Sequence, residues 1–474
     1  MFRFKPFFHG EIRRIGEFFP MIVVDLFSGG GGLSEGFHEN GYKIVAQVEK
    51  DRWACETLRT RMIYHHLRNC NDLNLYFDYL KKHRSYKTIN QDRIFIYEKY
   101  PELVEILDHV VLNKKFGNPA SDPQATSTKE IIRLIDNSLR FHNENSVNVI
   151  IGGPPCQAYS IVGRSRMKEQ AEKDPRNYLF FYYLTIVKEY QPDVFIFENV
   201  PGILNAKNGL VFEKIKEEFE LAGYRLTTGI EKDDQKNVID FADYGIPQKR
   251  KRVLLFGIRQ GLKIGYPVFE RYKYNWTNTL KVRDIISDLP FLHPGQGDDH
   301  KITDYASEIM LNPFLKEIRQ NSIGVLNHKA RPLHERDREI YKLAIIAAKN
   351  GVQLKYPDLP SHLKTHNNEK IFLDRFKVHW WDNIPHTVVA HIAKDGHYNI
   401  HPDISQLRSL TVREAARIQT FSDNHVFEGP RTAQYIQVGN AVPPLMSKII
   451  AKAIRDQLLS LNSDMPTCQS SSIS

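Results

Sequence analysis

Short apolar segments recur along the first half of the chain and alternate with amphipathic segments of helical period. Each is five to seven residues long and rich in Val, Ile and Phe, which is typical of strands buried on both faces of a parallel sheet. The segments are residues 21–27, 43–49, 147–151, 193–198 and 252–258. Strands that alternate with helices predict an α/β fold with a doubly wound, mostly parallel sheet.

Start and stop signals predict the helices. Asp51 is suited to cap a helix that follows the second strand, and Gly223 is suited to end a later one. Near the C-terminus, Thr411 is followed three residues later by Glu414, which is the pattern of a capping box. Residues 444–461 predict a closing amphipathic helix.

The strand–helix alternation breaks in several places, and the breaks predict the domain organisation. Residues 61–145 are polar, tyrosine-rich and mostly helical in pattern, so we expect an insertion there. After residue 262 the alternation is lost, which indicates a second, smaller domain. The expected divisions are an N-terminal arm at 1–20, a first domain at 21–262, the smaller domain at 263–432, a return to the first domain at 433–462 and a disordered tail at 463–474.

Composition narrows the classes of function. Apolar residues make up 41% of the 474 residues and charged residues 26%, as in ordinary globular proteins. Lys and Arg outnumber Asp and Glu by 65 to 56, a net charge of +9 that favours an anionic partner such as nucleic acid. A generically basic protein would show the same excess. The sequence contains no run of 18 apolar residues, so it predicts no membrane-spanning helix. Charges interrupt the first 20 residues too often for a signal peptide.

The four cysteines are Cys55, Cys70, Cys156 and Cys468. They form neither a CxxC motif nor a Cys/His cluster with zinc-ligand spacing, so we expect no metal site and no disulfide framework. A reducing, cytoplasmic location fits best.

A glycine-rich loop, DLFSGGGGLSEGF, follows the first strand. Glycines let the backbone approach a ligand closely, and Glu49 ends the next strand 20 residues after Gly29, where a carboxylate can accept both hydroxyls of a ribose. The dinucleotide fingerprint fails, because the position of its third glycine holds Ser34 or Glu35. The loop therefore predicts S-adenosylmethionine or another adenosine ligand rather than NAD. A tight turn beside an ordinary strand-end acid is the alternative.

Cys156 lies in GGPPCQAYS, directly after another strand. Loops at the carboxyl ends of parallel strands line the ligand crevice, and two prolines restrict how the thiol is presented. A lone cysteine is often a small buried hydrophobe, so the residues alone leave a nucleophile and a core residue both open.

Two further segments bear on this choice. FENVPG places Glu198 at the end of the neighbouring strand, although such an acid can also be structural. GIPQKRKRV places four cations just before the last strand, where they suit phosphate groups or deter pairing at a sheet edge.

Six blocks in this order resemble the DNA cytosine-5 methyltransferase family. They are DLFSGGGGLSEGF, GGPPCQAYS, FENVPG, DYGIPQKRKRV, RSLTVREAARIQTF and QVGNAVPP. The resemblance implies a Rossmann-like methyltransferase fold, S-adenosylmethionine as cofactor and double-stranded DNA as substrate. It also implies that the region after the basic block, about residues 263–407, recognises the DNA sequence.

The resemblance also implies roles for individual residues. The nucleophile would be Cys156, with Glu198, Arg250 and Arg252 as the other catalytic residues. The cofactor would be bound by Phe27, Ser28, Gly29, Gly30, Gly32, Glu49, Pro155 and Asn440. DNA would be contacted by Ser160, Gln248, Arg250, Arg252 and Thr411. Two positions depart from the family pattern: Lys50 replaces an aromatic residue, and Asp72 is only a poor match for the acid that contacts adenine.

The expected chemistry explains these residue types. A thiolate adding to C6 of cytosine makes C5 reactive, after which C5 accepts a methyl group and the loss of its proton expels Cys156. Glu198 would hold N3 and N4, and Arg252 would stabilise charge at O2. In a duplex the base must first be flipped out of the stack.

The resemblance further implies a monomer from a bacterial restriction-modification system, whose endonuclease acts on the same site without being a bound subunit. Rival readings are a tRNA methyltransferase with the same blocks, a catalytically silent DNA-binding module and, least favoured, a nicotinamide oxidoreductase. The recognised sequence cannot be read from the residues. Trp380 and Trp381 fit the core of the small domain better than a base contact.

Overall fold

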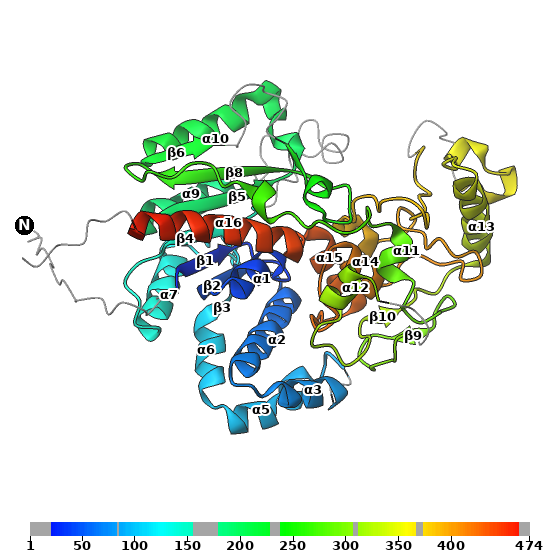
Figure 1. Cartoon of the computed structure of the whole chain (residues 1–474), viewed down its shortest axis with the longest axis horizontal. Helices are drawn as coiled ribbons and strands as arrows, with labels where there is room; N and C mark the ends of the chain where they lie inside the picture. Colours follow the sequence, from blue (N-terminus) through cyan, green and yellow to red (C-terminus); the bar gives the residue numbers. More distant parts are fainter. Residues whose placement is uncertain are drawn as a thin grey trace, which may run out of the picture.

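A mixed sheet forms the centre of the computed structural model, which describes residues 20–82, 85–154, 179–227, 238–306, 311–365 and 373–463. The strand order is β3-β2-β1-β4-β5-β8-β6, and the short β7 pairs with β8 (Figure 1). The strands are β1 (Ile22–Leu26), β2 (Lys43–Glu49), β3 (Val111–Asn113), β4 (Val149–Gly152), β5 (Val194–Asn199), β6 (Tyr224–Thr227), β7 (Ile239–Asp240) and β8 (Lys251–Arg259). This sheet confirms the predicted fold class.

Strand direction fixes where a ligand can bind. β1 to β5 are parallel, whereas β8 runs antiparallel to both β5 and β6. The order reverses at β1, because β2 and β3 lie on one side of it and β4 and β5 on the other. Ligands of open α/β sheets bind outside the carboxyl ends of the strands at such a switch point. The glycine loop leaves β1 there, and the chain toward Cys156 leaves β4.

Helices cover both faces of the sheet. Apolar residues of β1 alternate between the faces: Val23 packs in the core that includes α1 and α16, and Val24 in the core that includes α7, α9 and α10. These helices are α1 (Gly32–Glu39), α7 (Thr128–Phe141), α9 (Leu179–Tyr190), α10 (Leu210–Leu221) and α16 (Pro444–Ser463).

The segment expected as an insertion, residues 61–145, contributes to the sheet as well as projecting from it. The projecting part is a group of helices, seen at the bottom of Figure 1, whose apolar core also includes Leu326 and Val426. They are α2 (Arg52–Asn69), α3 (Leu73–Lys82), α4 (Ile89–Asp92), α5 (Ile94–Lys99) and α6 (Glu102–Val110). The chain then enters the sheet as β3, which pairs in parallel with β2 and brings Asn113 opposite Glu49.

The segment from α11 to α15 lies to the right in Figure 1. Its elements are α11 (Val282–Ile286), β9 (Gly297–Asp298), α12 (Pro313–Ile318), β10 (His328–Lys329), α13 (Glu335–Lys349), the 3-10 helix η9 (Ala390–Ala393), α14 (Val412–Ile418) and α15 (Arg431–Asn440). Trp380 packs against a small core around α13, and Trp381 packs against the main core, as expected for core residues.

The last helix returns to the first. α16 crosses α1, and a Cβ atom at Gly36 would lie 2.2 Å from the carbonyl carbon of Ser447, so only glycine permits this approach. None of the helices in the described ranges is both long enough and apolar enough to cross a membrane.

Candidate active site

The glycine loop turns sharply at the end of β1. Phe27 and Gly29 both have positive φ, and the amide of Gly29 donates to Oε2 of Glu49 over 2.9 Å. A Cβ atom at Gly29 would meet nothing within 4 Å among the described residues, so open space lies over this glycine. Gly32 serves packing instead, because a Cβ there would lie 2.3 Å from the carbonyl oxygen of Val442.

Two backbone amides hold the carboxylate of Glu49. Its Oε1 accepts from the amide of Asp51 over 2.8 Å, while Oε2 accepts from Gly29. Burial raises the pKa of Glu49, and these two amide hydrogen bonds oppose that rise. The carboxylate is therefore fixed at the carboxyl end of β2, beside the open space over Gly29.

Asp72 does not lie at the end of a strand. It lies between α2 and α3, and its carboxylate bonds Lys99 over 2.6 Å and Tyr100 over 2.9 Å. The residue at the carboxyl end of β3 is Asn113, whose amide nitrogen donates to the carbonyls of Glu49 and Lys50. Asp72 is therefore not the residue that follows the third strand, because the projecting helices separate it from the end of β3.

Phe27, Ser28 and Asn440 belong to or adjoin the same loop. The ring of Phe27 lies 5.1 Å from that of Phe116, while the hydroxyl of Ser28 turns inward to the carbonyl of Asp25. Asn440 ends α15 and is exposed, and its neighbour Ala441 lies against Gly32. An adenosine ligand with a sulfonium group fits this arrangement: a fixed acid for a ribose, aromatic rings and an unfilled space above a glycine.

Glu198 and Arg252 form an ion pair at the carboxyl end of β5. The Nε of Arg252 lies 2.7 Å from Oε1 of Glu198, and both side chains are largely buried. The Nη1 of Arg252 also donates to the carbonyl of Lys251 over 2.7 Å. An acid and a guanidinium side by side can bind a ring edge that presents both a donor and an acceptor, as cytosine does with N4 and O2 on either side of N3.

The strand that bears Glu198 also holds the chain that leads to Cys156. The amide nitrogen of Asn199 donates to the carbonyl of Pro154 over 3.2 Å, and a Cβ atom at Gly153 would lie 2.8 Å from Oε2 of Glu198. Sequence reasoning missed Asn199, although it directly follows the glutamate. The predicted site residues Pro155, Cys156 and Ser160 lie outside the described residues.

Three residues expected at the DNA are buried and bonded within the protein. Arg250 is 1% exposed and donates to the carbonyls of Val388 and Ala441, each over less than 3 Å, and more weakly to Gly439. The side chain of Gln248 bonds Gln419, the carbonyl of Ile418 and the amide of Val388. Thr411 caps α14 and bonds Nδ1 of His328 over 2.9 Å. This geometry argues against direct contacts of Gln248, Arg250 and Thr411 with DNA.

The basic block alternates in exposure. Lys249 and Lys251 are exposed, whereas Arg250 and Arg252 are buried. Successive residues of an extended strand point to opposite faces, which explains the pattern. The lysines therefore carry the charges of this block that reach solvent.

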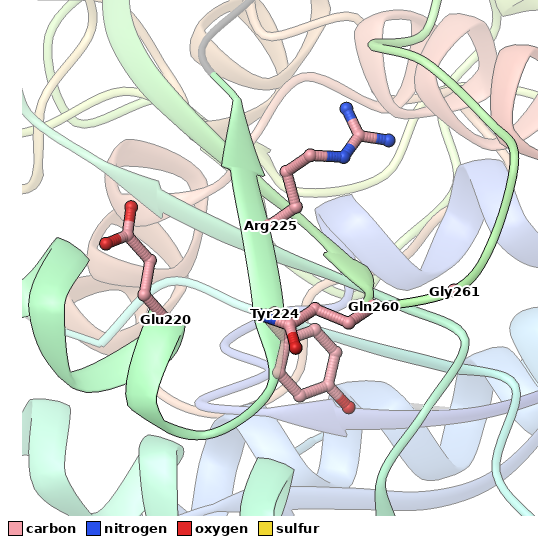
Figure 2. Close-up of a pocket in the computed structure, with 5 residues that line it drawn as sticks. All are labelled: Glu220, Tyr224, Arg225, Gln260 and Gly261. Atoms are coloured by element: carbon pink, nitrogen blue, oxygen red, sulfur yellow. The ribbon is translucent and has the colours of Figure 1, made fainter.

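A pocket at the outer edge of the sheet is a different feature. Figure 2 shows its lining, formed by Glu220, Tyr224, Arg225, Gln260 and Gly261. Tyr224 begins β6 and pairs with Arg259 at the end of β8, near the amino end of β5. The pocket is thus at the edge of the sheet opposite to the glycine loop and Glu198.

Comparison with known proteins decides the family. A model of the C-5 cytosine-specific DNA methylase family matches residues 21–82 and 121–456. The chain is 61% identical over 439 residues to the type II methyltransferase M.Bpa9945I of Bacillus paralicheniformis, covering 92% of this chain and 99% of that protein. The chain belongs to the C-5 cytosine-specific DNA methylase family. It is therefore a DNA cytosine-5 methyltransferase that uses S-adenosylmethionine.

More distant relatives agree. The methyltransferase is 29% identical to the type II methyltransferase M.DdeI of Desulfomicrobium norvegicum, covering 92% of this chain and 88% of that protein. Its fold is similar to that of a DNA modification methyltransferase encoded within an E. coli prophage, with a TM-score of 0.57 at 22% identity, over 93% of this chain and 99% of the other. Both the expected family and the expected cofactor are confirmed.

Proposed function

We propose that this methyltransferase modifies one cytosine within a defined double-stranded DNA sequence, through a transient bond between Sγ of Cys156 and C6 of a flipped-out base. The observation that carries this proposal is the ion pair of Glu198 with Arg252, on the strand whose next residue, Asn199, holds Pro154. Cys156 follows Pro154 by two residues in the sequence, and we propose that its thiol acts beside these two side chains.

In the proposed mechanism, Glu198 and Arg252 bind the edge of the base. One oxygen of Glu198 is paired with Arg252. Its other oxygen would accept from the N4 amine of cytosine, or from N3 once that nitrogen carries a proton. Arg252 retains guanidinium hydrogens for O2, where negative charge develops after the thiolate adds to C6. Bound S-adenosylmethionine supplies an electrophilic methyl group to C5. Transfer of the C5 proton to a water molecule then restores the double bond and expels Cys156 as a thiolate.

The cofactor would lie over Gly29, with its ribose hydroxyls on Glu49. Asn113 takes the place proposed earlier for Asp72: its amide nitrogen is occupied by two carbonyls, which leaves Oδ1 to accept from the exocyclic amine of adenine. The rings of Phe27 and Phe116 would provide an apolar wall. Gly30, Gly32 and Asn440 complete the loop and its neighbouring turn.

The biological setting follows from the relatives. M.Bpa9945I and M.DdeI are both named type II methyltransferases. We therefore propose that this chain protects DNA within a restriction-modification system, that residues 263–432 choose the DNA sequence, and that the enzyme acts as a monomer apart from the endonuclease. The exposed Lys249 and Lys251 would contact phosphates beside the site.

Trapping the covalent complex tests the mechanism. Bisulfite sequencing of DNA from cells that express the enzyme gives the target site, and a duplex with 5-fluorocytosine at that site should form a stable adduct in the presence of S-adenosylmethionine. Cys156→Ala should bind the same duplex without forming the adduct. Methylation of tRNA instead of duplex DNA, or an adduct with Cys156→Ala, would overturn the proposal.

A further inference from the structure

A residue near the end of the chain holds the centre of the glycine loop. The Nε2 of His425 lies 3.1 Å from the carbonyl oxygen of Gly30, a contact between residues 395 positions apart. A carbonyl can only accept, so Nε2 must carry the proton and donate. His425 lies in the turn between α14 and α15, which the sequence analysis did not single out.

The same peptide group is held from its other side. The amide of Gly31 donates to the carbonyl of Ser28 over 3.1 Å, so both polar groups of the Gly30–Gly31 peptide have partners. A Cβ atom at Gly30 would lie 3.1 Å from the Cβ of Gln437, which braces the loop from α15. No hydrogen bond is found for the amide nitrogen of Gly30 within the described ranges, so this donor remains free for a ligand.

The imidazole itself is fixed and neutral. Its ring lies 4.7 Å from that of Phe421 and 5.1 Å from that of Phe427, and the backbone carbonyl of His425 accepts from Arg413 over 2.9 Å. Burial, together with the nearby cation of Arg61, lowers the pKa of His425 to about 3. The imidazole is therefore a directed N–H donor at neutral pH.

Charged neighbours surround this donor. Oε2 of Glu35 lies 4.0 Å from Nδ1 of His425, and Glu35 forms a bidentate ion pair with Arg61 and a hydrogen bond with Nε2 of His65 over 3.2 Å. Arg61 in turn donates to the side chain of Asn424 over 2.6 Å. This buried network joins α1 and α2 to the residue that precedes His425.

We infer that His425 is a positioning residue for the cofactor: by holding the carbonyl of Gly30 it fixes the loop shape that S-adenosylmethionine requires. The inference rests on the proposed placement of the cofactor over Gly29. A loop released from His425 would have to be ordered by the cofactor itself, so cofactor binding should weaken while the chemistry at Cys156 is unchanged.

His425→Phe tests this role, because phenylalanine keeps the ring packing and removes the donor. Losing one hydrogen bond of this kind should raise the KM and Kd for S-adenosylmethionine about tenfold, with kcat and the KM for DNA within about twofold of the wild type. His425→Gln retains an N–H donor and should recover much of the affinity. Phe427→Leu is the matched packing control: it should lower Tm without changing the cofactor KM.

Two results distinguish the ways in which this account can fail. If His425→Phe lowers Tm but leaves cofactor affinity intact, while Glu49→Gln weakens it, His425 is structural only and the inference is wrong. If Glu49→Gln also leaves cofactor affinity intact, the placement of the cofactor is wrong and the inference fails with it. If His425→Phe does not fold, His425→Gln takes its place. A His425→Gln variant that has the Tm of the wild type but binds the cofactor no better than Glu49→Gln does would contradict the role.

Discussion

The guanidinium of Arg252 pairs with the carboxylate of Glu198 over 2.7 Å, across neighbouring antiparallel strands. β8 is the antiparallel strand of the sheet, and its first residues therefore lie beside the carboxyl end of β5, where the parallel strands also end. Because of this reversal, Arg252 near the start of β8 meets Glu198 near the end of β5.

Replacing Glu198 should impair catalysis far more than DNA binding. Glu198→Gln keeps the size of the side chain but removes the charge that pairs with Arg252 and holds the base. Because acid–base groups of this kind contribute about 10²–10⁴-fold, kcat should fall by that order. Single-turnover methylation measures the rate, and fluorescence anisotropy measures DNA affinity, which should change only a few-fold. A rate within threefold of the wild type would contradict the assigned role.

Asn199 should act on the nucleophile through the backbone. Asn199→Ala removes the donor to the carbonyl of Pro154, so kcat should fall about tenfold while the KM for S-adenosylmethionine stays constant. Asn148→Ala is a matched control, since Asn148 bonds Ile22 and Asp193 at the amino ends of the strands. It should cost similar stability with no loss of kcat. Equal loss of kcat in both variants would show a general effect on folding.

The alternating basic block predicts two different phenotypes. Lys249→Ala with Lys251→Ala should weaken binding to all DNA sequences and reduce the salt slope of log K by roughly 1.8, or about 0.9 for each phosphate contact. Tm should not change, because both lysines are exposed.

Arg250→Ala should instead destabilise the protein by about 3 kcal/mol, because buried carbonyls lose their donor. Urea denaturation measures this loss. A reduced salt slope with unchanged stability in this variant would restore Arg250 to the DNA surface.

Asp25 should make stability depend on pH. It lies buried beneath α1, where it accepts from the hydroxyl of Ser34, and burial raises the pKa of Asp25 to about 7. Between pH 4 and 7 the folded state keeps a proton that the unfolded chain loses, so this group's contribution falls as pH rises, by about 4 kcal/mol in all.

Asp25→Asn removes that titration. The stability of the variant relative to the wild type should therefore increase from pH 5 to 7 and level off above, as measured by urea denaturation across this range. Asp72→Asn is the control, because the Lys99 and Tyr100 hydrogen bonds lower the pKa of Asp72. The difference in stability between Asp72→Asn and the wild type should therefore be constant above pH 5. Parallel profiles for Asp25→Asn and the wild type would contradict the prediction.

Sequence patterns predicted the sheet well, because buried parallel strands are continuous apolar runs. β3 was missed, since it has three residues and follows a long helical segment. That omission is why Asp72 rather than Asn113 was considered beside the adenine. Asn113 reaches the side of Glu49 only because β3 pairs in parallel with β2.

The environment of a site residue could be predicted where all of its contacts come from one short sequence motif. The alternation of Lys249, Arg250 and Lys251 was visible in the sequence and could have shown which cations face inward. Thr411 was already predicted to cap a helix, and a hydroxyl engaged with the amide of Glu414 and with His328 is poorly placed to contact DNA. The contact of His425 with Gly30 could not be read from the sequence, because it joins segments at opposite ends of the chain.

The close crossing of α16 over α1 at Gly36 also bears on how the enzyme is made. The glycine loop is translated 395 residues before His425, which supports it, and earlier still than Ser447, which packs against Gly36. A nascent chain that stops short of these residues therefore lacks the contacts that shape the cofactor loop, and we expect such a truncated product to bind no cofactor and to methylate no DNA.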